Sequence, residues 1–172
     1  MSKTFWRRDI SRRTWFVLVL ALIAIDQLTK LFFASTIPFG QSVPVTPWFN
    51  FVHLRNTGAA FSFLADAGGW QRWFFIAIGI LVVLPISLLC LLRTTPTVER
   101  WFGLGIVAGG GSNLWDRVQG GSVVDFLDFH WKSLHWPAFN LADVYIVCTV
   151  VAWMGYSFWE SRRFPAANKE AV

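Results

Sequence analysis

Two aspartates in the second half of the chain have the setting expected of a catalytic pair. Asp125 follows two valines, and Asp143 comes about four residues into an apolar segment. Two partly desolvated carboxylates at one depth cannot both ionise easily, so one keeps its proton near neutral pH. Such a pair suits acid-base chemistry in which one carboxylate activates water and the other polarises a carbonyl. The spacing is equally consistent with two unrelated acids, Asp143 then forming a helix cap with Asn140.

Other charged and polar side chains lie near the ends of apolar segments. Asp26 and Lys30 are four residues apart, so on a helix they share a face and can neutralise each other. That pair either makes two polar residues tolerable in an apolar segment or helps to position a site. Asp116 and Arg117 are adjacent, and composition alone favours a surface ion pair. Three uncharged side chains could orient an acid or hold a peptide backbone: Asn56, Asn113 and Asn140.

Several other kinds of site are disfavoured by the sequence. The histidines His53, His130 and His135 have no ligand spacing on a common helix face, and HExxH does not occur. No serine has a glycine-flanked elbow. Cys90 and Cys148 fall inside apolar runs and are expected to be small buried residues that form no disulfide. We therefore expect no metal ion and no cofactor.

A glycine-rich segment is expected to serve helix packing. Gly105 and Gly109 have the four-residue spacing that lets a neighbouring helix approach closely. A phosphate-binding loop is disfavoured, because the glycine spacing fits neither the dinucleotide nor the P-loop pattern.

The composition is that of an integral membrane protein. Apolar residues make up 55% of the 172 residues and charged residues only 15%, against about a quarter in ordinary globular domains. The mean hydropathy is +0.48. The formal net charge of +5 comes from lysines and arginines that cluster at segment ends, as membrane topology requires. We therefore expect no nucleic-acid partner.

The pattern of apolar segments predicts one α-helical membrane domain over residues 1–172 with four transmembrane helices. The first helix is expected to stay uncleaved, because no small-residue cleavage pattern follows its apolar run. Prolines, glycines and short alternating runs predict a small extracytoplasmic β-cradle at about 35–69, with a turn at 56–62. An extracytoplasmic loop is expected at about 116–138. The helices are expected at about 15–34, 70–92, 98–115 and 139–159.

The distribution of basic residues predicts the orientation. The N-terminal segment, the link at 93–100 and the C-terminal tail carry ten lysines and arginines, and the opposite side carries five. Basic residues are enriched in cytoplasmic loops, so both termini are expected in the cytoplasm. The cradle and the loop at about 116–138 then share the outer face.

Five motifs, in order, resemble those of the lipoprotein signal peptidase family, also called signal peptidase II, whose members are bacterial membrane aspartyl peptidases. They cover nearly the whole chain. Ser112 is the one local departure, where the family more often has a small apolar residue or glycine. The motifs are Asp26-Gln-Leu-Thr-Lys30, Asn56-Thr-Gly-Ala-Ala-Phe-Ser62, Gly111-Ser-Asn113-Leu-Trp-Asp116-Arg117, Val123-Val-Asp125-Phe126 and Phe139-Asn140-Leu-Ala-Asp143.

The resemblance implies a metal-independent endopeptidase with Asp125 and Asp143 as its catalytic pair. The implied substrate is a prolipoprotein whose cysteine already carries diacylglycerol, cleaved just before that cysteine. The resemblance also implies contact with membrane lipid, inhibition by globomycin, a monomer, and a multi-pass location in the bacterial inner membrane with the site toward the periplasm. The residues implied to support the site or bind substrate are Asp26, Lys30, Asn56, Gly58, Asn113, Asp116, Arg117 and Asn140.

A small proton- or ion-coupled transporter is the alternative from another functional class, since intramembrane acids can form a relay. The sequence lacks the paired interrupted helices of many transporters, and its acids gather toward one face. A non-enzymatic membrane scaffold would leave these acids unexplained.

Overall fold

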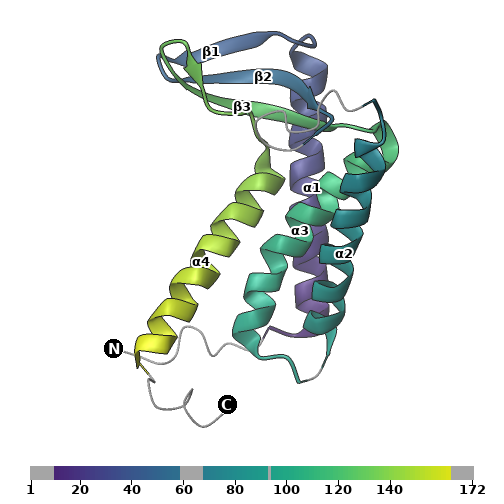
Figure 1. The fold of residues 1–172 in the computed structure, drawn as a ribbon, viewed down its shortest axis with the longest axis vertical. Helices are drawn as coiled ribbons and strands as arrows, with labels where there is room; N and C mark the ends of the chain where they lie inside the picture. The colour runs from purple at the N-terminus through teal and green to yellow at the C-terminus, as the bar shows by residue number, and fades with distance from the viewer. Residues whose placement is uncertain (1–9, 59–67, 93, 164–172) are drawn as a thin grey trace.

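Helices side by side, covered at one end by a small antiparallel sheet, make up the part of the chain that the structure describes (Figure 1). The computed structural model describes residues 10–58, 68–92 and 94–163. The elements in chain order are α1 (Arg12–Thr36), β1 (Ser42–Thr46), β2 (Phe49–Asn56), α2 (Gln71–Leu91), α3 (Thr97–Gly120), β3 (Val123–Trp131), β4 (Leu134–His135) and α4 (Leu141–Arg163).

Three of these helices have the length and composition of membrane spans. Within the described residues, α1, α2 and α4 are long and apolar enough to cross a bilayer. Their outward side chains are apolar and exposed, for example Leu28 on α1 and Leu81 on α2. The fold is therefore that of a helical membrane-type protein with a small antiparallel sheet.

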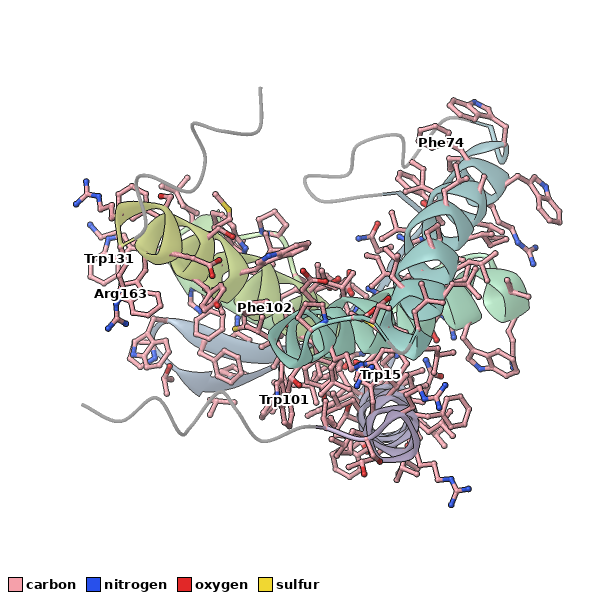
Figure 2. All side chains as sticks on the ribbon, turned by 90° about the horizontal axis from the view of Figure 1, so that it is seen from below. Trp15, Phe74, Trp101, Phe102, Trp131 and Arg163 are labelled. Carbon is pink, nitrogen blue, oxygen red and sulfur yellow. The ribbon has the colours of Figure 1, made fainter. Side chains whose placement is uncertain are left out.

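Helix α3 lies at the centre and packs against the other three helices. Its glycines allow this close approach, as the sequence predicted. A Cβ atom at Gly105 would overlap Thr149 of α4, and one at Gly109 would overlap the carbonyl oxygen of Ala142 at the start of α4. At the opposite end from the sheet, Trp15 is buried between α1 and α3 (Figure 2) and its indole N–H donates to the carbonyl of Arg100 at 2.8 Å.

The sheet has the order β1-β2-β3-β4 with antiparallel pairing throughout. Asn50 pairs with Asp128 and Leu54 with Asp125, with an irregularity in the register between these two pairs. Phe33 of α1 stacks on two sheet residues, Phe51 and Phe126, each with ring centroids 4.6 Å apart. These rings fix the sheet over the end of α1.

The predicted loop at 116–138 is wrong in most of its length. Asp116 and Arg117 belong to the last turns of α3, whose C-cap residue Gly121 adopts the left-handed conformation with φ 73°. Residues Val123–Trp131 then form β3, the third strand of a sheet that was expected only within 35–69. A strand forms because its backbone groups pair with β2, a long-range partner that the local sequence does not reveal.

Other predicted boundaries differ by a few residues from the helices in the structure. The first helix begins at Arg12 because Ser11 caps it, accepting a hydrogen bond from the backbone N–H of Thr14 at 3.0 Å. Cys148 is exposed on α4, so the prediction that it is buried is wrong. The predicted turn at 56–62 lies partly outside the described residues. Five basic residues of the orientation argument lie wholly outside them: Lys3, Arg7, Arg8, Arg93 and Lys169.

Candidate active site

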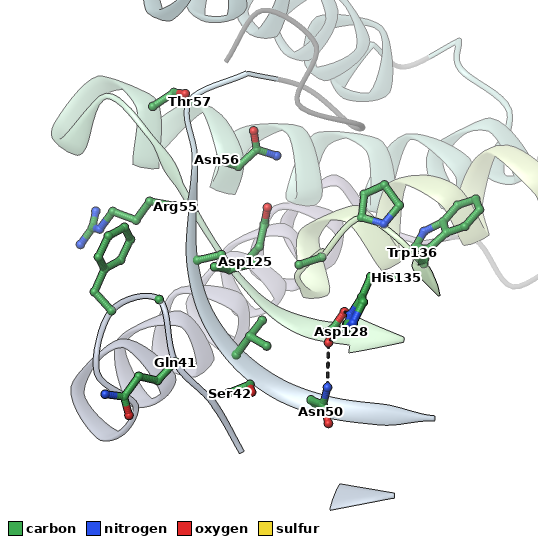
Figure 3. A pocket seen from close by; sticks show the side chains of 16 residues that line it. Gln41, Ser42, Asn50, Arg55, Asn56, Thr57, Asp125, Asp128, His135 and Trp136 are labelled. Carbon is green, nitrogen blue, oxygen red and sulfur yellow. Dashed lines mark hydrogen bonds and ion pairs between the residues drawn. The ribbon is translucent and has the colours of Figure 1, made fainter. Parts of the chain in front are cut away.

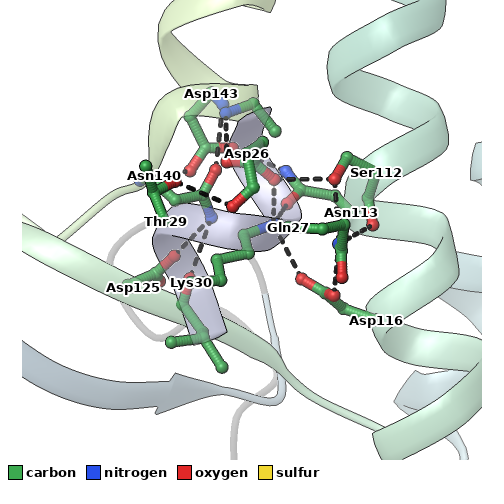
Figure 4. A network of polar contacts seen from close by, with 12 residues as sticks. Asp26, Gln27, Thr29, Lys30, Ser112, Asn113, Asp116, Asp125, Asn140 and Asp143 are labelled. Carbon is green, nitrogen blue, oxygen red and sulfur yellow. Dashed lines mark hydrogen bonds and ion pairs between the residues drawn. The ribbon is translucent and has the colours of Figure 1, made fainter. Parts of the chain in front are cut away.

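Asp26 is a fully buried carboxylate that joins three helices near the sheet. It lies on α1, and its side chain has 0% exposure. One oxygen accepts from Lys30 at 2.7 Å and from the Ser112 hydroxyl of α3 at 2.7 Å. The other accepts from the backbone N–H of Ala142 in the first turn of α4 at 2.9 Å. Asp26 therefore fixes the start of the helix that carries Asp143 (Figure 4).

Lys30 is shared by two carboxylates and an amide. Its ammonium group lies 2.7 Å from Asp26 and 2.7 Å from Asp116, and it donates to Oδ1 of Asn113 at 2.8 Å. The predicted pairing of Asp26 with Lys30 is present, and Lys30 also contacts Asp116 and Asn113. Burial of these charges is tolerable because each has a partner of opposite sign.

The interpretation of Asp116 and Arg117 as a surface ion pair is wrong. Asp116 turns toward Lys30, whereas Arg117 donates to the carbonyl of Gly58 at 2.9 Å and to that of Asn113 at 3.3 Å. Adjacent residues on a helix point in different directions, so neighbours in sequence need not pair. Arg117 thereby links α3 to the segment after β2.

Asn113 connects Lys30 to Asp143 through the two polar atoms of its side-chain amide. Because Lys30 donates to its amide oxygen, the amide nitrogen of Asn113 points to Asp143 and donates to Oδ1 at 2.8 Å. Asp143 also accepts from the backbone N–H of Asn140 at 3.2 Å, and its own N–H donates to Oδ1 of Asn140 at 3.1 Å. This reciprocal arrangement is a capping box at the start of α4.

Asn140 brings Asp125 to the same place. Its side chain is fully buried, and Nδ2 donates to Oδ1 of Asp125 at 2.7 Å while the rest of the residue binds Asp143. Asp125 lies on β3 with 3% exposure. Asp143 therefore forms the expected helix cap with Asn140, and the same asparagine also contacts Asp125.

The environment of Asp125 favours its protonated form. Burial and then the nearby charge of Asp143 raise the pKa of Asp125 to about 7, against opposing hydrogen bonds from Asn140 and Asn56 and the charge of Lys30. A carboxyl group with such a pKa can carry a proton near neutral pH and donate it to a reacting group.

Asn56 and Gly58 border the same site from the end of β2. The side-chain oxygen of Asn56 accepts from the backbone N–H of Gly58 at 3.0 Å, and Asn56 also hydrogen-bonds to Asp125. A groove of about 570 Å³ runs over the sheet and is lined by Asn56 and Asp125 among others (Figure 3). Of the two acids, Asp125 therefore lines the groove directly.

Two contributors to the site were not predicted. Gln27 donates to Asp116 at 2.7 Å and to the hydroxyl of Ser112 at 2.9 Å. Ser112 was expected only to pack as a small residue, but its hydroxyl binds Asp26. Both belong to the quoted motifs, so their position beside Asp26 and Asn113 in the sequence was the available signal.

Comparison with known proteins agrees with the resemblance found in the sequence. The sequence model of a family described as signal peptidase (SPase) II matches residues 18–159. The chain belongs to the signal peptidase II family. The function predicted from the motifs is thereby supported over the transporter alternative, and the family is one of proteases of bacterial membranes.

Named relatives of this signal peptidase II member are lipoprotein signal peptidases. One from Aeromonas hydrophila is 47% identical over 136 residues, covering 77% of this chain and 80% of its own. Another from Shewanella amazonensis is 44% identical over 170 residues, covering 96% of this chain and 98% of its own. A solved structure described as a bacterial membrane enzyme, determined by the in meso method, superposes with a TM-score of 0.74 at 26% identity, covering 92% of this chain and 93% of its own.

Proposed function

We propose that this protein is an aspartic endopeptidase that removes the signal peptide from diacylglyceryl-modified prolipoproteins, cleaving just before the lipidated cysteine. The observation that carries the proposal is the contact of Asn140 with both Asp125 and Asp143. Two acids on separate elements, held by one fully buried residue, suit hydrolysis of an amide by activated water. The names of the relatives supply the substrate class.

The two aspartates have different roles in the proposed mechanism. Asp143 accepts hydrogen bonds from Asn113 and from the backbone of Asn140, and it lies in the first turn of α4, where the helix dipole favours a negative charge. We therefore assign Asp143 as the base and Asp125, whose pKa is raised to about 7, as the acid.

The reaction then proceeds in two steps. Asp143 takes a proton from water, the water oxygen bonds to the scissile carbonyl carbon, and Asp125 gives its proton to the carbonyl oxygen. Asp143 next gives its proton to the departing amide nitrogen as the C–N bond breaks. Asp125 recovers a proton from the hydroxyl of the intermediate, which becomes the new carboxyl group, so both acids return to their starting states.

The surrounding polar residues hold the acids and the unwound substrate. A signal peptide that crosses the membrane as a helix must expose peptide groups near the scissile bond, and these need new hydrogen-bond partners. Asn56 lines the groove, and Gly58 and Arg117 are linked to it by hydrogen bonds, so these residues could provide them. The inner residues position the acids: Asp26, Lys30, Asn113, Asp116 and Asn140.

The proposed arrangement in the membrane is one domain with four spans. Helix α3 is the span added to α1, α2 and α4. The chain passes from α1 to the sheet, back along α2, up α3 to the sheet and back along α4, and the start of α1 and the end of α4 lie opposite the sheet (Figure 1). With basic residues at that end, both termini face the cytoplasm and the sheet faces the periplasm of a bacterial inner membrane. The enzyme works as a monomer in contact with lipid.

Purified protein in detergent, incubated with a prolipoprotein with and without diacylglycerol, tests this proposal. Mass spectrometry should find cleavage before the cysteine of the modified substrate alone, and globomycin should block it. Equal cleavage of the unmodified substrate would contradict the proposed specificity. EDTA should leave the rate unchanged, whereas a loss of activity that zinc restores would contradict metal independence.

A further inference from the structure

The groove extends beyond the catalytic pair and carries a second polar cluster. Its volume of about 570 Å³ is within the ~300–1,000 Å³ usual for ligand pockets. Asp125 lines one part of the groove, and Asn50, Asp128 and His135 line another (Figure 3). The mechanism above uses none of these last three residues.

Asp128 is the centre of this cluster and orients its two partners. It is only 6% exposed, and it accepts hydrogen bonds from Nδ2 of Asn50 at 2.9 Å and from Nδ1 of His135 at 2.8 Å. The amide oxygen of Asn50 and Nε2 of His135 therefore face away from the carboxylate. The His135 side chain is 52% exposed, so this cluster meets the open part of the groove. A buried carboxylate is costly unless it is hydrogen-bonded, and here both donors are fixed by the sheet.

The position of the cluster along β3 indicates which part of a substrate reaches it. Helix α3 ends at Gly120 and β3 begins at Val123, so later residues of the strand lie farther from the end of α3. Asp128 is three residues beyond Asp125, or about 10 Å at ~3.3 Å per residue. The signal-peptide side of the scissile bond must return to the membrane helices, which leaves the groove to the chain after the cysteine.

We propose that Asn50, Asp128 and His135 form a binding subsite for the first residues of the mature polypeptide. The proposal rests on the proposed function. The segment lies extended in the groove, and its backbone N–H groups donate to the amide oxygen of Asn50 and to Nε2 of His135. Asp128 holds both acceptors in place. About three residues after the scissile bond are needed to reach the cluster.

Two diacylglyceryl substrates with the same signal peptide test the subsite. The long substrate continues for about six residues after the cysteine, and the short one ends as an amide one residue after it, too early to reach Asp128. Asp128→Asn and His135→Ala should each raise KM for the long substrate about tenfold, the effect of one lost hydrogen bond, with kcat unchanged. Neither variant should alter cleavage of the short substrate. Ser133→Ala, at an exposed position between β3 and β4, is the control.

The outcomes separate this subsite from the catalytic proposal. An equal rise in KM for both substrates, or no rise for either, would overturn the proposed subsite. His135 is half-exposed, so His135→Ala gives the answer even where Asp128→Asn fails to fold. Asp125→Asn should abolish cleavage of both substrates, and full activity of that variant would instead contradict the proposed function.

Discussion

The two aspartates differ in the element that carries each carboxylate, although both accept hydrogen bonds. Asp143 is held by two donors, the Asn113 amide and the Asn140 backbone, at the start of a helix. Asp125 is buried on a strand, where its pKa is raised to about 7. The proposed mechanism depends on this difference, because one acid must donate a proton while the other accepts one.

The rate of cleavage should therefore fall as the pH rises above about 7, because Asp125 then loses the proton that it donates to the scissile carbonyl. The measurement is kcat/KM for a diacylglyceryl prolipoprotein across neutral and alkaline pH in one detergent. A rate that stays level or rises through this range would contradict the role of Asp125 as the acid.

Lys30 is the cation that two buried carboxylates share, so Lys30→Met should destabilise the protein strongly. Breaking a buried ion pair by removing one partner costs about 3–5 kcal/mol, and here both Asp26 and Asp116 lose their cation. Thermal unfolding in detergent should show a large fall in Tm, partly recovered when Asp26→Asn is added. Arg13→Met, at an exposed position of the same helix, is the control. A Tm equal to that of the control would show that the network contributes little to stability.

At the scale of elements, the contact of α3 with α4 places Asp143. A Cβ at Gly109 would overlap the carbonyl of Ala142 and come within 2.8 Å of Ile146, so α4 must shift. Ala142 is the residue before Asp143 and donates to Asp26, so a shift there disturbs the acid pair.

Gly109→Ala should therefore lower the free energy of unfolding by about 1–3 kcal/mol, because the added methyl group overpacks the contact between α3 and α4. It should also lower kcat. Gly155→Ala is a matched control, because a Cβ at Gly155 on α4 meets nothing within 4 Å. Tm and kcat measured for the two variants should separate them clearly. Wild-type kcat in Gly109→Ala would mean that α4 is not positioned through this contact.

The sheet contains a strand, β3, that the local sequence did not predict. The helices were predictable, because runs of apolar residues and the glycine spacing are local signals. Strand β3 was expected to be a loop, since Asp125 and Asp128 interrupt its apolar residues and its partner β2 lies far back in the chain. The pairing of Lys30 with Asp116 is equally remote, 86 residues apart, and no local pattern predicts it.

At the scale of the whole molecule, the candidate site depends on distant segments that the fold brings together. Spacing alone left Asp125 and Asp143 as either a pair or two unrelated acids. The contact through Asn140 could not be derived from spacing, because it needs β3 to pass beside the start of α4. The residues that the motif resemblance assigned to the site contact one another in the fold, and their catalytic and binding roles stay predictions.

The path of the chain predicts that both ends of the molecule lie on one side of the membrane. A reporter that is active only in the cytoplasm, fused after Val172, should give a signal, because the sequence concentrates its basic residues before α1, between α2 and α3, and after α4. A reporter inserted between β3 and β4, at Ser133, should be silent. A periplasmic signal from the C-terminal fusion would contradict the orientation.

The proposed catalytic pair is tested by cleavage of a diacylglyceryl prolipoprotein by Asp125→Asn and Asp143→Asn, with Glu160→Gln near the far end of α4 as the control. Each dyad variant should lose activity by about 10²- to 10⁴-fold while keeping the wild-type Tm in detergent, because each removes one proton-transfer group. Glu160→Gln should match the wild type. Undiminished cleavage by either folded dyad variant would contradict the assignment of Asp125 and Asp143 as the catalytic pair.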